Sequence, residues 1–338
     1  MGKSFTISSI ILASVLISSE GLITANATPG TGTLFGTDSK GGNLITINTS
    51  TGTATLVGPT GVFSIPALAV DPTAGIMYAG QGFGTPNVYT VNPSTGLATL
   101  LGDSGLGVAA ISGMDFRSDG TLFASVNIAG DGGTGSDNLA TIDTGTGAAT
   151  VIGPYGTCTG VVVPSIGGGS CTLEGMDAIA FAPDGTLYGA TSSGVGKNGE
   201  LYIINTLTGT ATHVASILDS TGAGPTGGVS SLHFACDGTL YAGTGKGTKL
   251  GSSTLIKINP LNGQFTIVGS TGLTSSLGGL AFAGKCAGPV NPVGGTIIPV
   301  DMTSLFVAGV FTNAFWILPV LGAIVAASVF FKTKRKVE

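Results

Sequence analysis

Residues 178–191 read AIAFAPDGTLYGAT and residues 201–216 read LYIINTLTGTATHVAS, and these two stretches decide the fold. Each contains two short apolar segments on either side of a tight turn, Asp-Gly in the first and Thr-Gly in the second. Apolar residues that alternate with polar ones between turn residues are typical of antiparallel β-strands. The two stretches therefore predict four consecutive strands that pair in one sheet.

The same unit recurs along the chain. Its first segment has copies at residues 67–70, 113–116, 178–181, 231–234 and 279–282. After each of the first four copies, the second, third and fourth segments follow in the same order. A repeated unit of four strands predicts the blades of a β-propeller.

One of the five units is split between the two ends of this region. Residues 33–35, 44–48 and 53–58 supply its second, third and fourth strands, whereas its first strand lies at residues 279–282. We therefore expect an all-β propeller of five four-stranded blades, closed by pairing of the last strand with the first three. Such closure leaves no open edge at the seam. A sixth, degenerate blade within residues 153–177 stays an alternative, because that repeat interval is the longest.

Composition narrows the classes of function. Glycine makes up 59 of the 338 residues, and only 9% of the residues are charged. These values argue against a helix-rich enzyme and against a charged disordered chain, and the glycines lack the G-X-Y period of collagen. Because the formal net charge is −5, a basic patch for nucleic acid is not expected.

The repeated motifs, LAFxPDGTLYA and L(x)xINxxTGxAT(x)VG, resemble those of YVTN and WD40-like extracellular β-propellers over about residues 30–286. The Trp-Asp dipeptide is missing, since the only tryptophan is Trp316. The resemblance implies that the first strand of each unit is innermost. The connections between second and third strands are long and lie opposite the tight turns, so they form the candidate binding face: residues 36–43, 80–87, 125–138, 190–200 and 243–254.

The first 27 residues have the pattern of a signal peptide. Lys3 precedes an apolar run, and Ala25-Asn26-Ala27 matches a small-residue cleavage site. A retained N-terminal anchor stays an alternative, although the apolar run is short for a membrane span. The mature ectodomain is expected to cover residues 28–286.

Residues 305–331 contain no charged residue and predict a transmembrane helix. The basic tail at residues 332–338 predicts a cytoplasmic C-terminus, and residues 287–304 form a stalk that contains proline and glycine. Residues 294–322 resemble the C-terminal anchor of archaeal cell-surface proteins, which implies an envelope location; in some such families this tail is removed as a sorting signal. We expect a single-pass protein of the cell membrane with its ectodomain outside.

Four cysteines in an exported chain predict two disulfides. We favour Cys158 with Cys171, which closes a short insertion, and Cys236 with Cys286, near the closure of the ring; the other two connectivities stay open. No C-x-x-C pair indicates a metal site. The sequon Asn48-Thr49-Ser50 predicts a glycosylation site.

Two positions of the innermost strands depart from the repeat. Asp115 and His233 stand where other units have alanine, and such a pair in the central channel could bind a cation or polarise a ligand. The alternative is that both side chains are satisfied between blades or by water. Asp131 and Asp137 are candidate Ca²⁺ ligands, although the EF-hand spacing is missing and a solvated loop is the simpler interpretation. His213 is expected on the surface of an outer strand.

The sequence contains no convincing catalytic constellation, and the G-x-S-x-G nucleophile motif does not occur. We therefore expect a binding or structural module rather than an enzyme, with a surface protein or glycan as its partner and with calcium as the one candidate cofactor. The alternative is an extracellular hydrolase or lyase with a cation site near Asp115 and His233.

Overall fold

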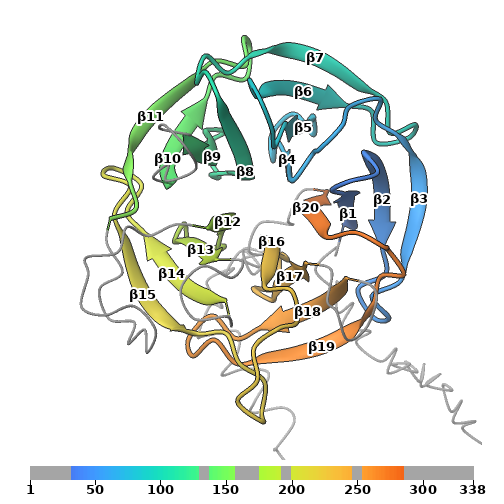
Figure 1. Cartoon of the computed structure of the whole chain (residues 1–338), viewed down its shortest axis with the longest axis vertical. Coiled ribbons are helices and arrows are strands. Elements are labelled where there is room, and N and C mark those ends of the chain that lie inside the picture. Colours follow the sequence, from blue (N-terminus) through green and yellow to red (C-terminus); the bar gives the residue numbers. More distant parts are fainter. Residues whose placement is uncertain (1–31, 129–136, 157–174, 192–198, 246–252, 285–338) are drawn as a thin grey trace, which may run out of the picture. The chain divides into compact units, whose positions relative to one another are not determined.

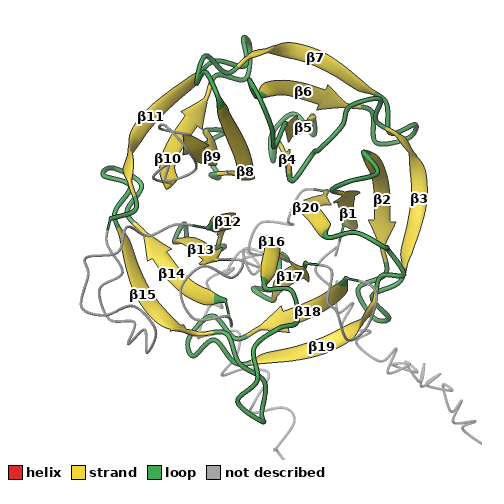
Figure 2. Ribbon diagram, in the orientation of Figure 1, coloured by secondary structure: helices red, strands yellow, loops and turns green. Residues whose placement is uncertain are grey.

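The computed structural model describes residues 32–128, 137–156, 175–191, 199–245 and 253–284, and this part of the chain contains twenty strands (Figures 1 and 2). The strands form five sheets of four strands each. Each sheet is a blade arranged around a common centre (Figure 1). The prediction of an all-β propeller with five four-stranded blades is confirmed for these residues.

Within each blade, the strands follow one another from the centre outward. The first blade contains β20 (Leu277–Ala283), β1 (Thr33–Asp38), β2 (Asn43–Ile47) and β3 (Ala54–Pro59); the second contains β4 (Ala67–Val70), β5 (Met77–Gly80), β6 (Asn87–Val91) and β7 (Ala98–Asp103). The third contains β8 (Ala109–Phe116), β9 (Leu122–Ile128), β10 (Asp137–Ile142) and β11 (Ala149–Pro154). The fourth contains β12 (Met176–Phe181), β13 (Leu187–Thr191), β14 (Glu200–Ile204) and β15 (Ala211–Ser216); the fifth contains β16 (Val229–Phe234), β17 (Leu240–Thr244), β18 (Thr254–Ile258) and β19 (Phe265–Ser270).

The ring closes between the two ends of the described chain. Strand β20 pairs antiparallel with β1, and Ala281 lies opposite Phe35. The inner strands β4, β8, β12, β16 and β20 each contact both neighbours around the centre. This closure and the innermost position of the first strand of each unit are as predicted.

The two ends of the strands define two faces of the ring. The turns from first to second strands and from third to fourth strands lie at one end, which we call the tight-turn face; residues 71–76 and 48–53 are examples. The remaining connections lie at the other end, which we call the loop face; residues 60–66, 81–86 and 104–108 belong to it.

Small residues let the inner strands approach one another closely. A Cβ on Gly113 would lie 3.0 Å from the α-carbon of Ala178 in the next blade. A Cβ on Gly279 would lie 2.6 Å from the Cβ of Leu68, which real Cβ atoms do not tolerate. Glycine at these positions therefore permits the narrow centre that five blades require.

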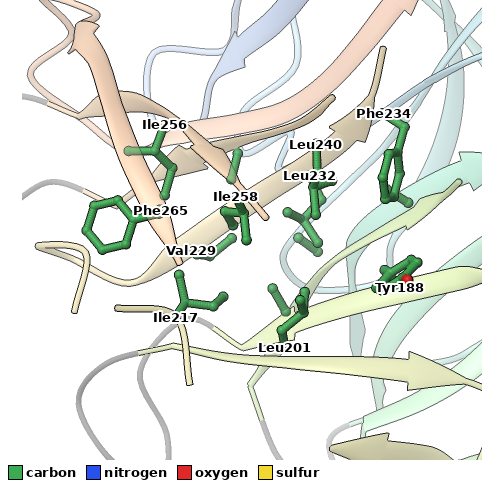
Figure 3. Packing of buried hydrophobic residues seen from close by; sticks show 14 residues of the cluster. Tyr188, Leu201, Ile217, Val229, Leu232, Phe234, Leu240, Ile256, Ile258 and Phe265 are labelled. Atoms are coloured by element: carbon green, nitrogen blue, oxygen red, sulfur yellow. The ribbon is translucent and has the colours of Figure 1, made fainter. Parts of the chain in front are cut away.

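Apolar side chains fill the space between neighbouring blades. Figure 3 shows the cluster between the fourth and fifth blades, to which Leu201, Val229 and Ile256 contribute. The rings of Tyr188 and Phe234 lie 5.4 Å apart in the same cluster. Burial of an apolar side chain of this size contributes about 1.5–3 kcal/mol, so contacts between blades hold the ring together.

The outer strands follow one another end to end around the circumference (Figure 1). The first residue of each outer strand donates its N–H to a carbonyl just beyond the preceding outer strand, over 2.8–3.1 Å: Ala54 to Thr271, Ala98 to Thr60, Ala149 to Ser104, Ala211 to Tyr155 and Phe265 to Leu218. Beside these bonds, the turn glycine of one blade packs on the outer strand of the preceding blade, as Gly96 does on Gly58. The motif TGxAT(x)VG therefore joins neighbouring blades.

Every outer strand also contains a β-bulge at the same place. The extra residue packs inward against the core, at Val57, Leu101, Ile152, Val214 and Val268. A bulge bends a strand and disturbs the row of free backbone groups along its outer edge. The outer strands are thus poorly suited to pair with a further strand from another chain.

Several sequence predictions fall outside the described residues. They are the signal peptide at residues 1–27, the stalk at 287–304, the transmembrane helix at 305–331, the tail at 332–338, and most of the insertion considered for a sixth blade. Among the residues that the structure describes, no helix is long and apolar enough to cross a membrane. Cys236 is disulfide-bonded, but Cys158, Cys171 and Cys286 lie outside the described residues, so the proposed pairings stay predictions.

Candidate functional site

Asp115 and His233 meet at the centre of the ring. Each is the penultimate residue of an inner strand, Asp115 of β8 and His233 of β16. The Nε2 atom of His233 lies 3.4 Å from Oδ1 of Asp115, although β12 separates the two strands around the ring. The structure therefore brings together the two residues that depart from the alanine pattern.

The carboxylate of Asp115 ties two inner strands together. Its Oδ2 atom accepts a hydrogen bond of 2.7 Å from the backbone N–H of Phe181, at the end of β12. Its Oδ1 atom accepts one of 2.8 Å from the N–H of Phe116 on its own strand and also faces His233. Both carboxylate oxygens are thus engaged, which is the arrangement expected of a buried carboxylate with a structural role.

His233 is surrounded by acceptors. Its Nδ1 atom lies 2.8 Å from the carbonyl oxygen of Phe234, and its Nε2 atom faces Asp115. Burial alone would lower the pKa of His233, but the negative charge of Asp115, its contact with the ring and the Phe234 carbonyl raise the pKa above the ordinary value. Because both ring nitrogens face acceptors, the imidazolium is the form that fits the site.

The centre has little room for a ligand. The side chains of Asp115 and His233 are only 6% and 15% exposed. The cavity between the inner strands has a volume of about 10 Å³ and is lined by residues that include Leu68, Met114 and Ile179. This is about the space that one water molecule requires. Asp115 and His233 do not line this cavity, and their own low exposure and hydrogen bonds favour the interpretation of polar groups satisfied between blades.

Asp137 has a structural environment as well. It is 3% exposed, its Oδ1 atom accepts a 2.5 Å hydrogen bond from the side chain of Asn127, and its Oδ2 atom accepts a 2.7 Å bond from the N–H of Met176. The expectation of a solvated loop is wrong for Asp137, whose carboxylate holds the start of β12. Asp131 lies outside the described residues. Within the described ranges, no three His, Cys, Asp or Glu side chains are grouped so that they could hold a metal ion.

His213 lies in the outer strand β15 as expected, but its side chain is only 20% exposed and is paired rather than free at the surface. Its Nε2 atom lies 2.8 Å from Oε2 of Glu200, which is itself buried, and the hydroxyl of Ser216 donates to Oε1 over 3.1 Å. The carboxylate lies between the imidazole and the hydroxyl, so the histidine does not activate the serine as in a hydrolase triad. Glu200 was not singled out from the sequence, although other units have Asn or Thr at this position, as at Asn87 and Thr254.

An exposed apolar patch lies on the loop face of the second blade. Phe63, Phe83 and Val108 are 68%, 76% and 64% exposed. Their three loops are joined by backbone hydrogen bonds, from Gly82 to the carbonyl of Ser64 over 3.0 Å and from Ala109 to that of Gly84 over 2.9 Å. We call Phe63, Phe83 and Val108 the loop-face patch.

Two properties distinguish the loop-face patch. Residues 60–66, 81–86 and 104–108 contain no charged side chain. Among the described residues, Ser64 is the only non-glycine residue with a positive φ, at 58°, and it directly follows Phe63. Such a conformation is uncommon outside glycine and often occurs at functional sites. The repeat pattern did not reveal this patch, because the three residues lie in loops that differ between blades.

Asn48, the predicted glycosylation site, is exposed on the tight-turn face. Its side-chain oxygen accepts hydrogen bonds of 2.9 and 3.0 Å from the N–H groups of Ser50 and Thr51. Equivalent turns are built the same way at Asn92, Asp143, Asn205 and Asn259. A role in turn formation therefore explains an Asn or Asp at this position, and glycosylation of Asn48 stays a prediction.

Comparison with known proteins assigns no family to this chain. No protein-family model matches the chain, and no curated protein matches it. Similar solved structures include a gluconolactonase, XC5397, from Xanthomonas campestris (15% identity, TM-score 0.46, 73% of this chain and 74% of that one) and a nidogen/laminin complex (17%, 0.44, 75% and 83%). A third is the calcium-binding protein regucalcin from Agrobacterium tumefaciens (15%, 0.43, 76% of each chain). At this level of similarity, these structures carry no argument about the fold, the activity or the ligands of this chain.

Proposed function

We propose that this protein is a membrane-anchored module of the cell surface that binds a partner protein through the loop face of its propeller. The observation that carries the proposal is the loop-face patch. Exposed aromatic residues in an uncharged setting are typical of the core of a protein–protein interface. The partner would present apolar side chains to Phe63, Phe83 and Val108; a glycan partner is an outcome that the test distinguishes.

The location rests on the two ends of the chain. The signal peptide and the apolar segment 305–331, followed by basic residues, support export with the C-terminus inside. The described ring ends with β20, whose last residues lie at the tight-turn face. The described part of the chain thus ends at the face opposite the loop-face patch.

The hydrolase or lyase alternative finds no support at the proposed position. The Asp115 side chain is buried, and each of its carboxylate oxygens already accepts a backbone hydrogen bond. A general acid or base needs contact with the substrate. A binding module requires no such access to the centre.

The test is photo-crosslinking with the full chain on intact cells. A photoreactive residue at the exposed position Thr85, beside Phe83, should capture a partner, whereas the same residue at Leu207 on the tight-turn face should not. Phe63→Ser combined with Phe83→Ser should abolish the capture at position 85. The matched control is Leu207→Ser with Leu261→Ser, which removes two side chains that are 85% and 82% exposed on the opposite face.

The outcomes separate the candidates clearly. A captured protein that depends on Phe63 and Phe83 supports the proposal. A captured glycan changes the class of partner. Equal capture in the patch variant and in the control would overturn the loop-face patch as the binding surface.

A further inference from the structure

Two side chains connect three inner strands at the tight-turn end of the ring's centre. The carboxylate of Asp115, on β8, accepts a hydrogen bond from the N–H of Phe181 on β12. It also faces the imidazole of His233 on β16. His233 also contacts β20, because its ring centroid lies 5.7 Å from that of Phe282. One ion pair therefore touches four of the five inner strands.

We propose that the Asp115–His233 pair is a pH-sensitive clasp that closes the centre of the propeller while His233 is protonated and loosens it when the proton leaves. The geometry supports this directly. With the proton, both ring nitrogens donate, one to Phe234 and one toward Asp115. Without it, the neutral ring keeps a single N–H, which can serve either the Phe234 carbonyl or the Asp115 carboxylate but not both. A lone pair then faces one of the two acceptors, and the charge attraction to Asp115 is lost in either tautomer.

Few other titratable groups face His233. Asp115 contributes the carboxylate from β8, and Tyr241 lies opposite His233 in the register with β17, with the ammonium of Lys257 5.3 Å from the centroid of its ring. Strand β20 contains no titratable residue. The remaining charged groups nearby belong to other contacts or to the far end of a strand: Arg117 pairs with Asp119 at 2.6 Å, and Asp177 lies at the loop-face end of β12. After burial, which lowers the pKa of His233, the charge of Asp115 is therefore the largest influence, and it raises this pKa.

Loss of the contact between Asp115 and His233 would affect the centre of the ring and not the sheets of the blades. The pair joins β8 to β16 across the centre, whereas the backbone hydrogen bonds within each blade do not depend on it. Once His233 turns away, the Asp115 carboxylate loses one of the contacts that position it as the acceptor of the Phe181 N–H, so this hydrogen bond opens more often. The expected response to alkaline pH is local opening of the centre at its tight-turn end, not unfolding of the blades.

The sequence makes the test unusually direct, because the chain has only two histidines. In the full chain with His213→Gln, His233 is the sole histidine, and glutamine keeps a donor for Glu200. A pH titration of the labelled imidazole by NMR then reports His233 alone. We expect its pKa above about 6.5, the ordinary value, and we expect Asp115→Asn to shift it below that value, because burial is then no longer offset.

A second measurement follows the opening itself. Hydrogen-exchange protection of the Phe181 amide, corrected for the intrinsic effect of pH, should fall as the pH rises through the pKa of His233. Protection of the Gly243 amide, within β17 of the fifth blade, should stay constant as a control. The proposal is overturned if His233 titrates at or below about 6.5 in the otherwise native chain, if Asp115→Asn leaves its pKa unchanged, or if the Phe181 amide shows no fall in protection.

Discussion

Gly58 and Gly96 lie back to back between the first two blades: a Cβ placed on Gly96 would stand 2.5 Å from the carbonyl oxygen of Gly58. Gly96 also has φ of +82°, a conformation that side chains with a Cβ rarely adopt. The same relationship recurs between Gly102 and Gly147, between Gly153 and Gly209, and between Gly269 and Gly52. In the remaining contact, Gly263 meets Ser216.

The first prediction concerns this contact. Gly96→Ala should lower the free energy of unfolding by about 2–4 kcal/mol, because the left-handed backbone costs about 1–2 kcal/mol and the overlap with Gly58 costs about as much again. Gly120→Ala is the matched control, since Gly120 has φ of +88° but nothing within 4 Å of an added Cβ. Urea denaturation measures both. Equal losses in the two variants would show that packing between blades adds nothing.

The second prediction concerns the pH dependence of stability. The pKa of His233 is raised in the folded protein. The stability that this proton contributes should therefore be fully present below about pH 6.5, the pKa in an unfolded chain, and should be lost as the pH rises through the higher folded pKa. His233→Gln should thus be less stable than the native chain at acid pH, with a difference that shrinks at alkaline pH. Denaturation midpoints across this range provide the measurement, and a difference that grows with pH would contradict the assigned sign.

The third prediction distinguishes the two interpretations of Asp137. If its carboxylate accepts the hydrogen bond from the N–H of Met176, Asp137→Ala should lower the free energy of unfolding by about 1–3 kcal/mol, because a buried donor loses its partner. This loss should be the same with added calcium and with a chelator. A native protein that gains stability with calcium, and a variant that does not, would instead favour the calcium site.

The fourth prediction concerns Tyr155, which is fully buried. Its hydroxyl makes no well-formed hydrogen bond in the described part of the chain, although the side chain of Ser125 lies near enough to it to oppose the strong rise in pKa that burial causes. Removal of an unsatisfied buried hydroxyl is nearly neutral or stabilising, so Tyr155→Phe should change the free energy of unfolding by less than about 1 kcal/mol, or increase it. Thermal unfolding would measure this change. A loss above about 2 kcal/mol would mean that the hydroxyl is satisfied, for example by water.

The fifth prediction follows from the uncharged loop-face patch. Binding through Phe63, Phe83 and Val108 should persist in about 1 M salt, where surface charges are screened beyond about 3 Å. The measurement is the yield of the crosslink at position 85 as a function of salt. A steep fall in yield would indicate that charged residues outside the patch carry the interaction.

The repeat pattern predicted the blades because each strand carries its own alternation of apolar residues and its own turn glycine. The same comparison drew attention to Asp115 and His233, but it could not predict that they touch. They belong to blades that are not neighbours, and they meet at the narrow centre, where glycines such as Gly113 and Gly279 let neighbouring inner strands approach closely. The sequence reports what each unit contains, whereas distance across the ring depends on all five units together.

The misjudged residues have a common cause. His213 was assigned to the surface because it lies in an outer strand, but the buried partner that covers it, Glu200, comes from the next strand inward. Phe63 and Phe83 lie in loops, where no period exists to compare. In both cases the environment of the residue depends on contacts with another strand or loop. The apolar pattern of a single strand carries no information about such contacts.

The hydrogen bond from Ala54 to Thr271 joins the outer strands of the first and fifth blades, on the far side of the sheet from the pairing of β1 with β20. Two separate contacts therefore close the ring, one at its centre and one at its circumference. If tension on the C-terminal segment peeled β20 away, the circumference would still be held by this bond and by Gly52 packed on Gly269. If the protein is anchored through its C-terminal segment as proposed, force on that segment would thus detach one strand before it could separate the blades.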